Sequence, residues 1–323
     1  MRRREFIGLV GGAVAAWPFI AHAQKPVKPH RIFWVSTETQ PDPFVDGFRE
    51  GLRERGYIEG KDVVLELRYA PGNPDALRGV MSELTRGNVD VVVSSGPAIR
   101  AMKAATDVPV LFAISGDPVE LGLVKSLARP GGNFTGSTFL SLELAEKRVE
   151  LLKEIFPQLH RLAVLSNTDH PGERSEWIAT QQAAQKLGID LIYVPFVGAR
   201  ELDSALALVG NARADAMLVF PEGATIVHRA RIALFAVAQR LPSMFGWSEY
   251  CDAGGLLSYG ANQRATYFRL ATYADRILRG ETPADIPVEQ PTKFELVVNL
   301  STAKALRIEV PKSILLRADR VIE

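Results

Sequence analysis

Short runs of Val, Ile and Leu alternate with amphipathic helical segments along most of this 323-residue chain. The run Val91-Val92-Val93, bounded by Asp90 and Ser94, is typical of a strand that is buried on both faces. Because such strands alternate with helical segments, the pattern predicts parallel sheets with crossover helices. The expected strands span Arg31–Val35, Val63–Tyr69, Val89–Ser94, Pro109–Ala113, Arg161–Leu165, Asp190–Val194, Ala216–Phe220, Leu241–Phe245 and Phe294–Asn299.

The same order of elements occurs twice, which predicts two similar, doubly wound α/β lobes. Apolar residues with a spacing near 3.6 indicate helices in segments 44–52 and 178–187. Gly56 and Gly188 follow these segments and fit a left-handed helix C-cap. Each helix leads into a strand, a second helix and a second apolar strand. A later helix is expected from about Gln263 to Leu278.

A segment rich in Gly, Pro and Asn, residues 127–136, separates the two halves of the pattern. Because glycine supplies backbone freedom, this segment fits either a hinge between the lobes or an ordinary surface loop. A chain that returns to each lobe late in the sequence connects the lobes by three crossings. We therefore expect lobe I at 28–137 and 255–290, and lobe II at 138–254 and 291–323.

The first 23 residues have the layout of a cleavable export leader. Three arginines precede an apolar run from Phe6 to Ile20, which is too short for the roughly 20 residues that span a bilayer. The segment Arg3-Arg4-Glu5-Phe6-Ile7 resembles the twin-arginine export pattern, but general secretory leaders also begin with basic residues. We expect cleavage near Ala23 and a soluble periplasmic product.

Charge and residue counts argue against several kinds of partner and site. The whole chain has a net charge of +1, and loss of the leader, with its three Arg and one Glu, changes this to about −1. A near-neutral chain offers no electrostatic reason to bind nucleic acid. A single cysteine, Cys251, excludes an internal disulfide framework and a multi-cysteine metal site, and we interpret it as a packing residue. No metal and no cofactor are expected.

Two other functional classes lack their sequence signatures. The chain contains no Gly-x-Ser-x-Gly elbow, no phosphate loop and no dinucleotide fingerprint after a strand, so we do not expect an enzyme. A two-lobed transcription regulator would need a helix-turn-helix ahead of the first strand, and residues 24–30 are too few for one.

Candidate ligand-binding residues follow from where parallel strands end. Ligands of open α/β sheets bind beyond the carboxyl ends of the strands, and in a two-lobed protein both sets of ends face one cleft. This rule selects Ser36, Thr37, Ser94, Ser95, Gly96, Ser115, Gly116 and Asp117 in the first lobe, and Asn167, Thr168, Glu222, Gly246 and Trp247 in the second.

Several of these residues have both a binding and a structural interpretation. Ser94, Ser95 and Gly96 precede a helix, so they could hold a carboxylate or only cap that helix. Asp117 could pair with a ligand ammonium group or only form a turn.

Three aromatic residues are candidate stacking walls for an apolar or aromatic ligand. Trp247, Tyr250 and Tyr259 lie near predicted strand ends, where such side chains could equally well pack in the core. Together with the polar candidates, they indicate a small amphipathic solute with a carboxylate, such as an amino acid or an aromatic carboxylate.

Several motifs are spread over nearly all of the chain beyond the leader: residues 56–61 (GYIEGK), 117–119 (DPV), 122–124 (GLV), 128–136 (ARPGGNFTG), 253–260 (AGGLLSYG) and 290–299 (QPTKFELVVN). Together they resemble one family, the substrate-binding proteins of ABC importers that include tryptophan-binding members. The resemblance implies the type I periplasmic binding fold, a monomer, and a membrane permease as partner. The chain departs from the family pattern at residues 94–96 and 247–249, which leaves the solute open.

The expected function is capture of a small solute between two lobes that close about a hinge, followed by docking on the permease of an ABC importer. Two alternatives remain open from the sequence. One is a binding protein that senses a small molecule without transport, and the other is a periplasmic enzyme.

Overall fold

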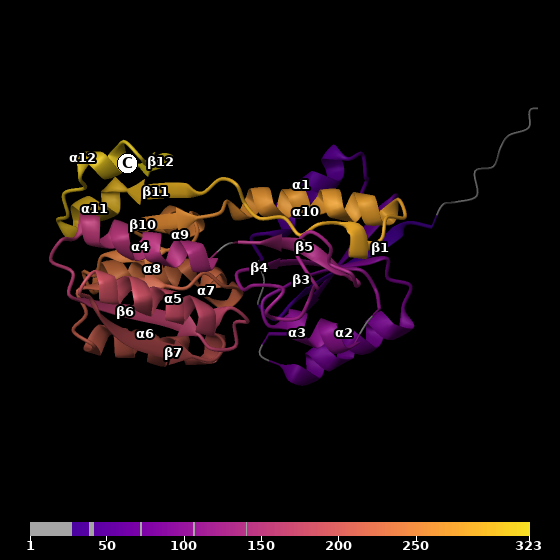
Figure 1. The fold of residues 1–323 in the computed structure, drawn as a ribbon, viewed down its shortest axis with the longest axis horizontal. Helices are drawn as coiled ribbons and strands as arrows, with labels where there is room; N and C mark the ends of the chain where they lie inside the picture. Colours follow the sequence, from indigo (N-terminus) through magenta and orange to yellow (C-terminus); the bar gives the residue numbers. More distant parts are fainter. Residues whose placement is uncertain (1–27, 39–41, 72, 106, 140) are drawn as a thin grey trace, which may run out of the picture.

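The computed structural model describes residues 28–323 except 39–41, 72, 106 and 140. The expected export leader, residues 1–23, lies outside the described residues. The described chain forms two α/β lobes, each built around its own sheet, and the lobes lie end to end (Figure 1). The expected α/β fold class with two parallel-sheet lobes is confirmed.

The first lobe holds a five-stranded sheet and the helices that cover it. Its elements are β1 (His30–Ser36), α1 (Val45–Glu54), β2 (Val63–Tyr69), α2 (Pro74–Arg86), β3 (Val91–Ser95), α3 (Ala98–Ala105), β4 (Val110–Ile114), β5 (Phe134–Thr138) and α10 (Gln263–Leu278), followed by a 3-10 helix at Pro283–Asp285.

The second lobe holds a seven-stranded sheet. Its elements are α4 (Ser141–Ile155), β6 (Arg161–Asn167), α5 (Glu173–Lys186), β7 (Asp190–Phe196), a 3-10 helix at Ala199–Glu201, α6 (Leu202–Asn211), β8 (Ala216–Val219), α7 (Gly223–Val227), α8 (Arg229–Ala238), β9 (Ser243–Phe245), α9 (Glu249–Asp252), β10 (Leu257–Gly260), β11 (Glu295–Asn299), α11 (Leu300–Leu306), α12 (Lys312–Leu315) and β12 (Arg320–Ile322).

Strand order confirms that one architecture is used twice. The first sheet runs β2-β1-β3-β4-β5, and the second contains the equivalent series β7-β6-β8-β9-β10, extended by β11 and β12. All pairs are parallel except β10 with β11, which is antiparallel. This antiparallel pair is the one exception to the expected parallel pairing, and it forms where the chain re-enters the second lobe from the opposite direction.

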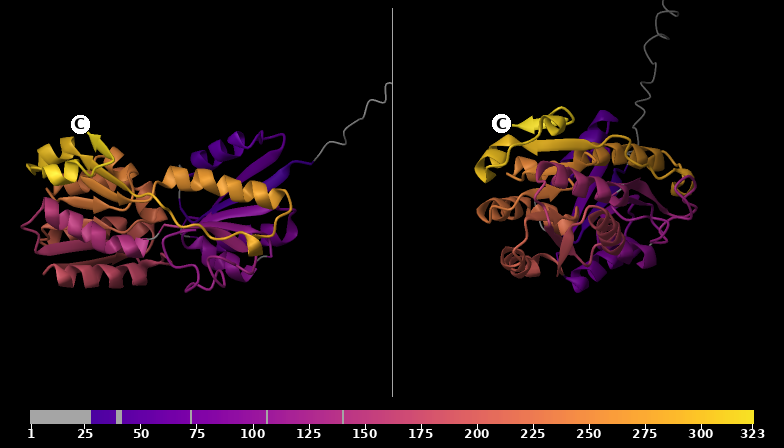
Figure 2. Two further views of the ribbon diagram at one scale, coloured as in Figure 1. Left: turned by 45° about the horizontal axis from the view of Figure 1, so that its top comes forward. Right: turned by 60° about the vertical axis from the view of Figure 1, so that its left-hand side comes forward.

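After the fifth strand of each series, the chain crosses to the other lobe. It leaves β5 to form α4, which packs on α5 and β10, and it leaves β10 to form α10, which packs on α1. A third crossing, residues 290–294, leads into β11. Figure 2 shows α10 lying along the lobe that contains the N-terminal strands. The expected three-crossing connection is confirmed.

The expected connection at residues 127–136 is wrong in its last residues. Phe134–Thr138 forms β5, the edge strand of the first sheet, so the chain crosses only after Thr138. Gly136 has φ +151°, and a Cβ added there would lie 2.0 Å from the carbonyl oxygen of Phe112 on β4. This glycine therefore permits close approach of two backbones and is not a hinge.

The second crossing also comes later than the sequence predicted. We expected the chain to return to lobe I at residue 255, but β10 pairs with β9 in the second sheet. The return begins after Gly260, and α10 then starts at Gln263, where the side chain of Asn262 caps the helix by accepting the N–H of Ala265 at 2.8 Å.

Cys251 is buried in the second lobe, as its interpretation as a packing residue requires. Burial raises the pKa of its thiol to about 12. Among residues 28–323 that the structure describes, no helix is both long and apolar enough to cross a bilayer.

Candidate functional site

A cleft of about 580 Å³ lies between the lobes. Residues that follow β1 and β6 line it from opposite sides, as the rule for strand ends predicts. Two residues selected from the sequence, Thr37 and Asn167, are among them. The lining residues are Thr37, Glu38, Ala70, Pro71, Asn73, Pro74, Leu77 and Pro97 from the first lobe, and Asn167, Asp169, Val197, Gly198, Ala199 and Arg200 from the second.

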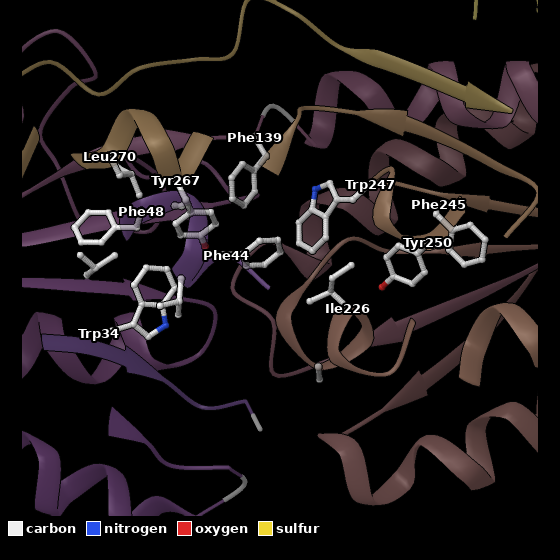
Figure 3. Close-up of a cluster of buried hydrophobic side chains, with 14 of the residues drawn as sticks. Trp34, Phe44, Phe48, Phe139, Ile226, Phe245, Trp247, Tyr250, Tyr267 and Leu270 are labelled. Atoms are coloured by element: carbon white, nitrogen blue, oxygen red, sulfur yellow. The ribbon is translucent and has the colours of Figure 1, made fainter. Parts of the chain in front are cut away.

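An interlobe aromatic cluster, formed by Phe44, Phe139, Trp247 and Tyr267, joins the two lobes (Figure 3). Trp247, which follows β9, lies edge-on to Phe44 at 5.6 Å and to Phe139 at 5.7 Å between ring centroids. Phe44 stacks on Tyr267 of α10 at 4.8 Å. All four side chains are buried. Large aromatic rings from both lobes thus meet at the lobe boundary.

Two carboxylates from opposite lobes also meet there. Glu38 follows β1, and its side chain packs against Gly223, since a Cβ added at Gly223 would lie 2.7 Å from Glu38 Cγ. The carboxylate of Glu222 accepts the N–H groups of Ala224 at 2.7 Å and Thr225 at 2.5 Å, which caps α7. Glu222 also accepts a hydrogen bond from the Asn167 amide at 3.2 Å.

Burial of this acidic pair has an electrostatic consequence. Desolvation, followed by the negative charge of Glu222, raises the pKa of Glu38 to about 8. Desolvation likewise raises the pKa of Glu222. Because two buried carboxylates repel each other, a proton or a cationic group stabilises the pair. An ammonium group would serve this purpose.

The residues after β4 form a direct contact between the lobes. The Ser115 hydroxyl hydrogen-bonds Nε2 of His170 in the second lobe. Gly116 lies against Gly172, since a Cβ added at Gly116 would be 3.1 Å from Gly172 Cα. Burial, followed by the positive charge of Arg100, lowers the pKa of His170 to about 3. Burial thus keeps His170 neutral, and the contact requires closely apposed lobes.

Asp117 lies beyond that contact and is engaged in its own turn. Its carboxylate accepts the N–H groups of Val119 at 2.7 Å and Glu120 at 3.3 Å. These bonds match the turn interpretation of its sequence. The structure does not bring Asp117 to Glu38 or to the interlobe aromatic cluster.

Ser94 and Ser95 are the last two residues of β3, and only Ser95 points to the sheet face that carries the aromatic cluster. The Ser94 hydroxyl is buried and has no hydrogen-bond partner among the described residues. The Ser95 side chain reaches the hydroxyl of Tyr267, and Gly96 has φ +58° ahead of α3. Ser36, at the end of β1, is buried, and its hydroxyl accepts the N–H of Glu38 at 3.1 Å.

The remaining aromatic candidates pack within the second lobe. Tyr250 stacks on Phe245 at 4.4 Å between ring centroids, beside the interlobe aromatic cluster (Figure 3). The ring centroids of Tyr259 and Phe294 lie 6.2 Å apart. The carbonyl oxygen of Tyr259 accepts a hydrogen bond from Arg148 at 2.9 Å. Tyr259 therefore does not join the cluster at the lobe boundary.

Four residues of the interlobe aromatic cluster and the acidic pair did not emerge from the sequence as site residues: Glu38, Phe44, Phe139 and Tyr267. Glu38 is one residue beyond Thr37, so a slightly wider search at the end of β1 would have found it. The apolar spacing that includes Phe44 indicated a helix but no place in a binding site. Phe139 follows β5, a strand that the sequence did not reveal. Among the described residues, no group of three or more His, Cys, Asp or Glu side chains is arranged to hold a metal ion.

Known proteins share this architecture. A tyrosine-binding protein of Clostridioides difficile is 26% identical over 267 residues, which are 81% of this chain and 76% of that protein. An ABC domain in complex with L-Trp from Streptococcus pneumonia has a TM-score of 0.83 at 24% identity. A conserved domain protein from Vibrio cholerae has a TM-score of 0.82 at 27% identity. Both structures cover 91% of this chain over 100% of their own length.

The fold and the family follow from these matches. More distant structures with the same fold include a periplasmic binding protein/LacI transcriptional regulator, so the expected type I periplasmic binding fold is confirmed. The model of the family described as ABC transporter substrate binding protein matches residues 35–322. That match spans nearly all of the described chain, and the protein belongs to the ABC transporter substrate binding protein family.

Proposed function

We propose that this protein captures an aromatic amino acid between its lobes in the periplasm and delivers it to the permease of an ABC importer. The observation that carries the proposal is the interlobe aromatic cluster beside the acidic pair Glu38 and Glu222. The rings suit an aromatic side chain, and the carboxylates suit an ammonium group. The relatives described as tyrosine-binding and as a complex with L-Trp support the same ligand class.

Closure of the lobes is the proposed mechanism. The contacts of Ser115 with His170 and of Phe44 with Trp247 join opposite lobes, so they form only when the lobes are closed. A solute that touches both lobes binds the closed state more tightly and shifts the population toward it. The three crossings supply the hinge. The permease then binds the closed conformation, which is populated when solute is bound.

Isothermal titration calorimetry of the purified protein tests this proposal. The titrants are L-tryptophan, L-tyrosine, L-phenylalanine, L-leucine and L-glutamate, with D-glucose as a control from another solute class. We expect at least one aromatic amino acid to bind more tightly than leucine and glutamate, and glucose not to bind. A protein freed of co-purified ligand that binds none of the aromatic amino acids would overturn the proposal.

Affinity for the amino acid is expected to rise with pH up to about 8. The pKa of Glu38 is raised to about 8, so below that pH the carboxyl holds a proton that the ligand ammonium must displace. Each pH unit below the raised pKa therefore weakens binding by up to about tenfold. Titrations at pH 7 and pH 8, in buffers of different ionisation enthalpy, measure both the affinity and the number of protons released.

Glu38→Gln is the matched variant for this pH dependence. It retains the size of the side chain but removes its titration, so the affinity of the variant should be lower and should not vary between pH 7 and pH 8. An unchanged pH dependence in the variant would assign the effect to another group.

A further inference from the structure

Gln263, the first residue of α10, has a fully buried side chain whose amide lacks partners. Its exposed fraction is 0%, and neither Oε1 nor Nε2 has a hydrogen-bond partner among the described residues. Buried polar groups are almost always hydrogen-bonded, because leaving one unpaired costs its full desolvation free energy. An amide with both atoms unpaired is therefore expected to bind something that the isolated chain does not contain.

Gln263 lies close to the lobe boundary because of its place at the start of α10. Gln263 and Tyr267 are four residues apart on α10, so they share one helix face. Tyr267 belongs to the interlobe aromatic cluster, stacks on Phe44 and is reached by the side chain of Ser95. Because α10 begins at the second crossing, Gln263 lies about 6 Å from Tyr267 along the helix axis, toward the second lobe.

Backbone packing connects this position with the acidic pair. Gly260, three residues before Gln263, packs on Gly246, since a Cβ added at Gly260 would lie 1.9 Å from the Gly246 carbonyl oxygen. Gly246 in turn packs on Pro221, which precedes Glu222. Trp247 follows Gly246 directly. The start of α10 is thus connected through Gly246 and Pro221 to the segment that carries Glu222, beside Trp247.

We propose that Gln263 binds the head group of an α-amino acid. This inference rests on the proposed function. Oε1 of Gln263 accepts a hydrogen bond from the ligand ammonium, and Nε2 donates one to the ligand carboxylate. A head group with only one of these charges leaves one atom of the amide unpaired. The site therefore selects zwitterions over amines and over simple carboxylates.

Calorimetry with ligand analogues tests this assignment. The probes are L-tryptophan, tryptamine, which lacks the carboxylate, and indole-3-propionate, which lacks the ammonium, together with L-tyrosine, tyramine and the corresponding phenol propionate. Wild-type protein should bind the amino acid more tightly than either analogue. Gln263→Leu should bind the amino acid at least about 100-fold more weakly, since two hydrogen bonds to charged groups each contribute about tenfold or more. The analogues should lose much less affinity.

Thermal unfolding without ligand provides a second readout. Because Gln263→Leu removes an unpaired buried amide, the ligand-free variant should have a higher Tm than the wild type. Gln182→Leu is the matched control, since Gln182 lies exposed on α5 and should change neither the affinity nor the preference for zwitterions.

The outcomes separate this inference from the proposed function. If the wild type binds an aromatic amino acid and Gln263→Leu binds it equally well, Gln263 does not bind the head group. The proposed function is unaffected by that result. If Gln263→Leu has a lower Tm than the wild type and the same affinity, the amide stabilises the folded protein, for example by a hydrogen bond to an internal water molecule. If the wild type binds neither L-tryptophan nor L-tyrosine, the proposed function and this inference are both wrong.

Discussion

Replacing Arg148 by methionine should lower the free energy of unfolding by about 3–5 kcal/mol. Arg148 on α4 donates to Glu176 on α5 at 2.9 Å, and the two side chains are only 2% and 1% exposed. Burial raises the pKa of Glu176 to about 8, although the charge of Arg148 opposes the shift. Without Arg148, the Glu176 carboxyl would be buried with no cation, and its Oε2 atom already lacks a partner among the described residues. Urea denaturation followed by circular dichroism measures the loss.

Two further variants separate the ion pair from general packing. Arg148→Met combined with Glu176→Leu should recover most of the lost stability, because well-packed apolar groups replace a buried ion pair at little cost. Lys147→Met is the control on the same helix. Lys147 pairs with Glu150 at the surface, so its replacement should change stability by less than about 0.5 kcal/mol. A single Arg148→Met variant as stable as the wild type would contradict this account.

Arg148 also connects the ion pair to the hinge. It donates through Nε to the carbonyl oxygen of Tyr259, close to the end of β10 and just ahead of the second crossing. Because α4 begins after the first crossing, one side chain anchors both crossings to the second lobe. The stability of this pair and the precision of lobe closure are therefore expected to depend on the same residues.

Long and strongly apolar elements of the fold were predictable from the sequence, whereas short edge strands were not. The expected range of β2 agrees with the structure at both ends, and so does that of α10. β5 was missed because its sequence, FTGST, is polar and glycine-containing and becomes a strand only beside β4. β12 has three residues and exposed side chains, so it has no hydrophobic signal of its own.

The candidate site was predictable only where it follows from strand ends. That rule found Asn167, Glu222 and Trp247, because the strand before each of them is clear in the sequence. It could not find the interlobe aromatic cluster, since Phe44 and Phe139 reach the lobe boundary through tertiary packing. The unpaired amide of Gln263 was equally hidden, because the start of a helix is visible in a sequence but the burial of its side chain is not.

Trp247→Ala should weaken binding of the aromatic amino acid by about 3 kcal/mol, which is more than a hundredfold. The Trp247 ring is 3% exposed and contacts Phe44 and Phe139 across the lobe boundary. Its removal takes away stacking surface for the ligand and also contacts that hold the lobes closed. Calorimetry gives the affinity, and small-angle X-ray scattering with saturating ligand reports whether the lobes still close.

Trp177→Ala is the matched control for this prediction. Trp177 lies on α5 and packs on Tyr193 at 4.5 Å between ring centroids, within the second lobe. Its loss should lower stability but leave the affinity for the amino acid unchanged, because none of its ring contacts crosses the lobe boundary among the described residues. Equal losses of affinity in the two variants would indicate general destabilisation. Unchanged affinity in Trp247→Ala would show that this ring only packs the boundary, and the ligand would then have to bind elsewhere along the cleft.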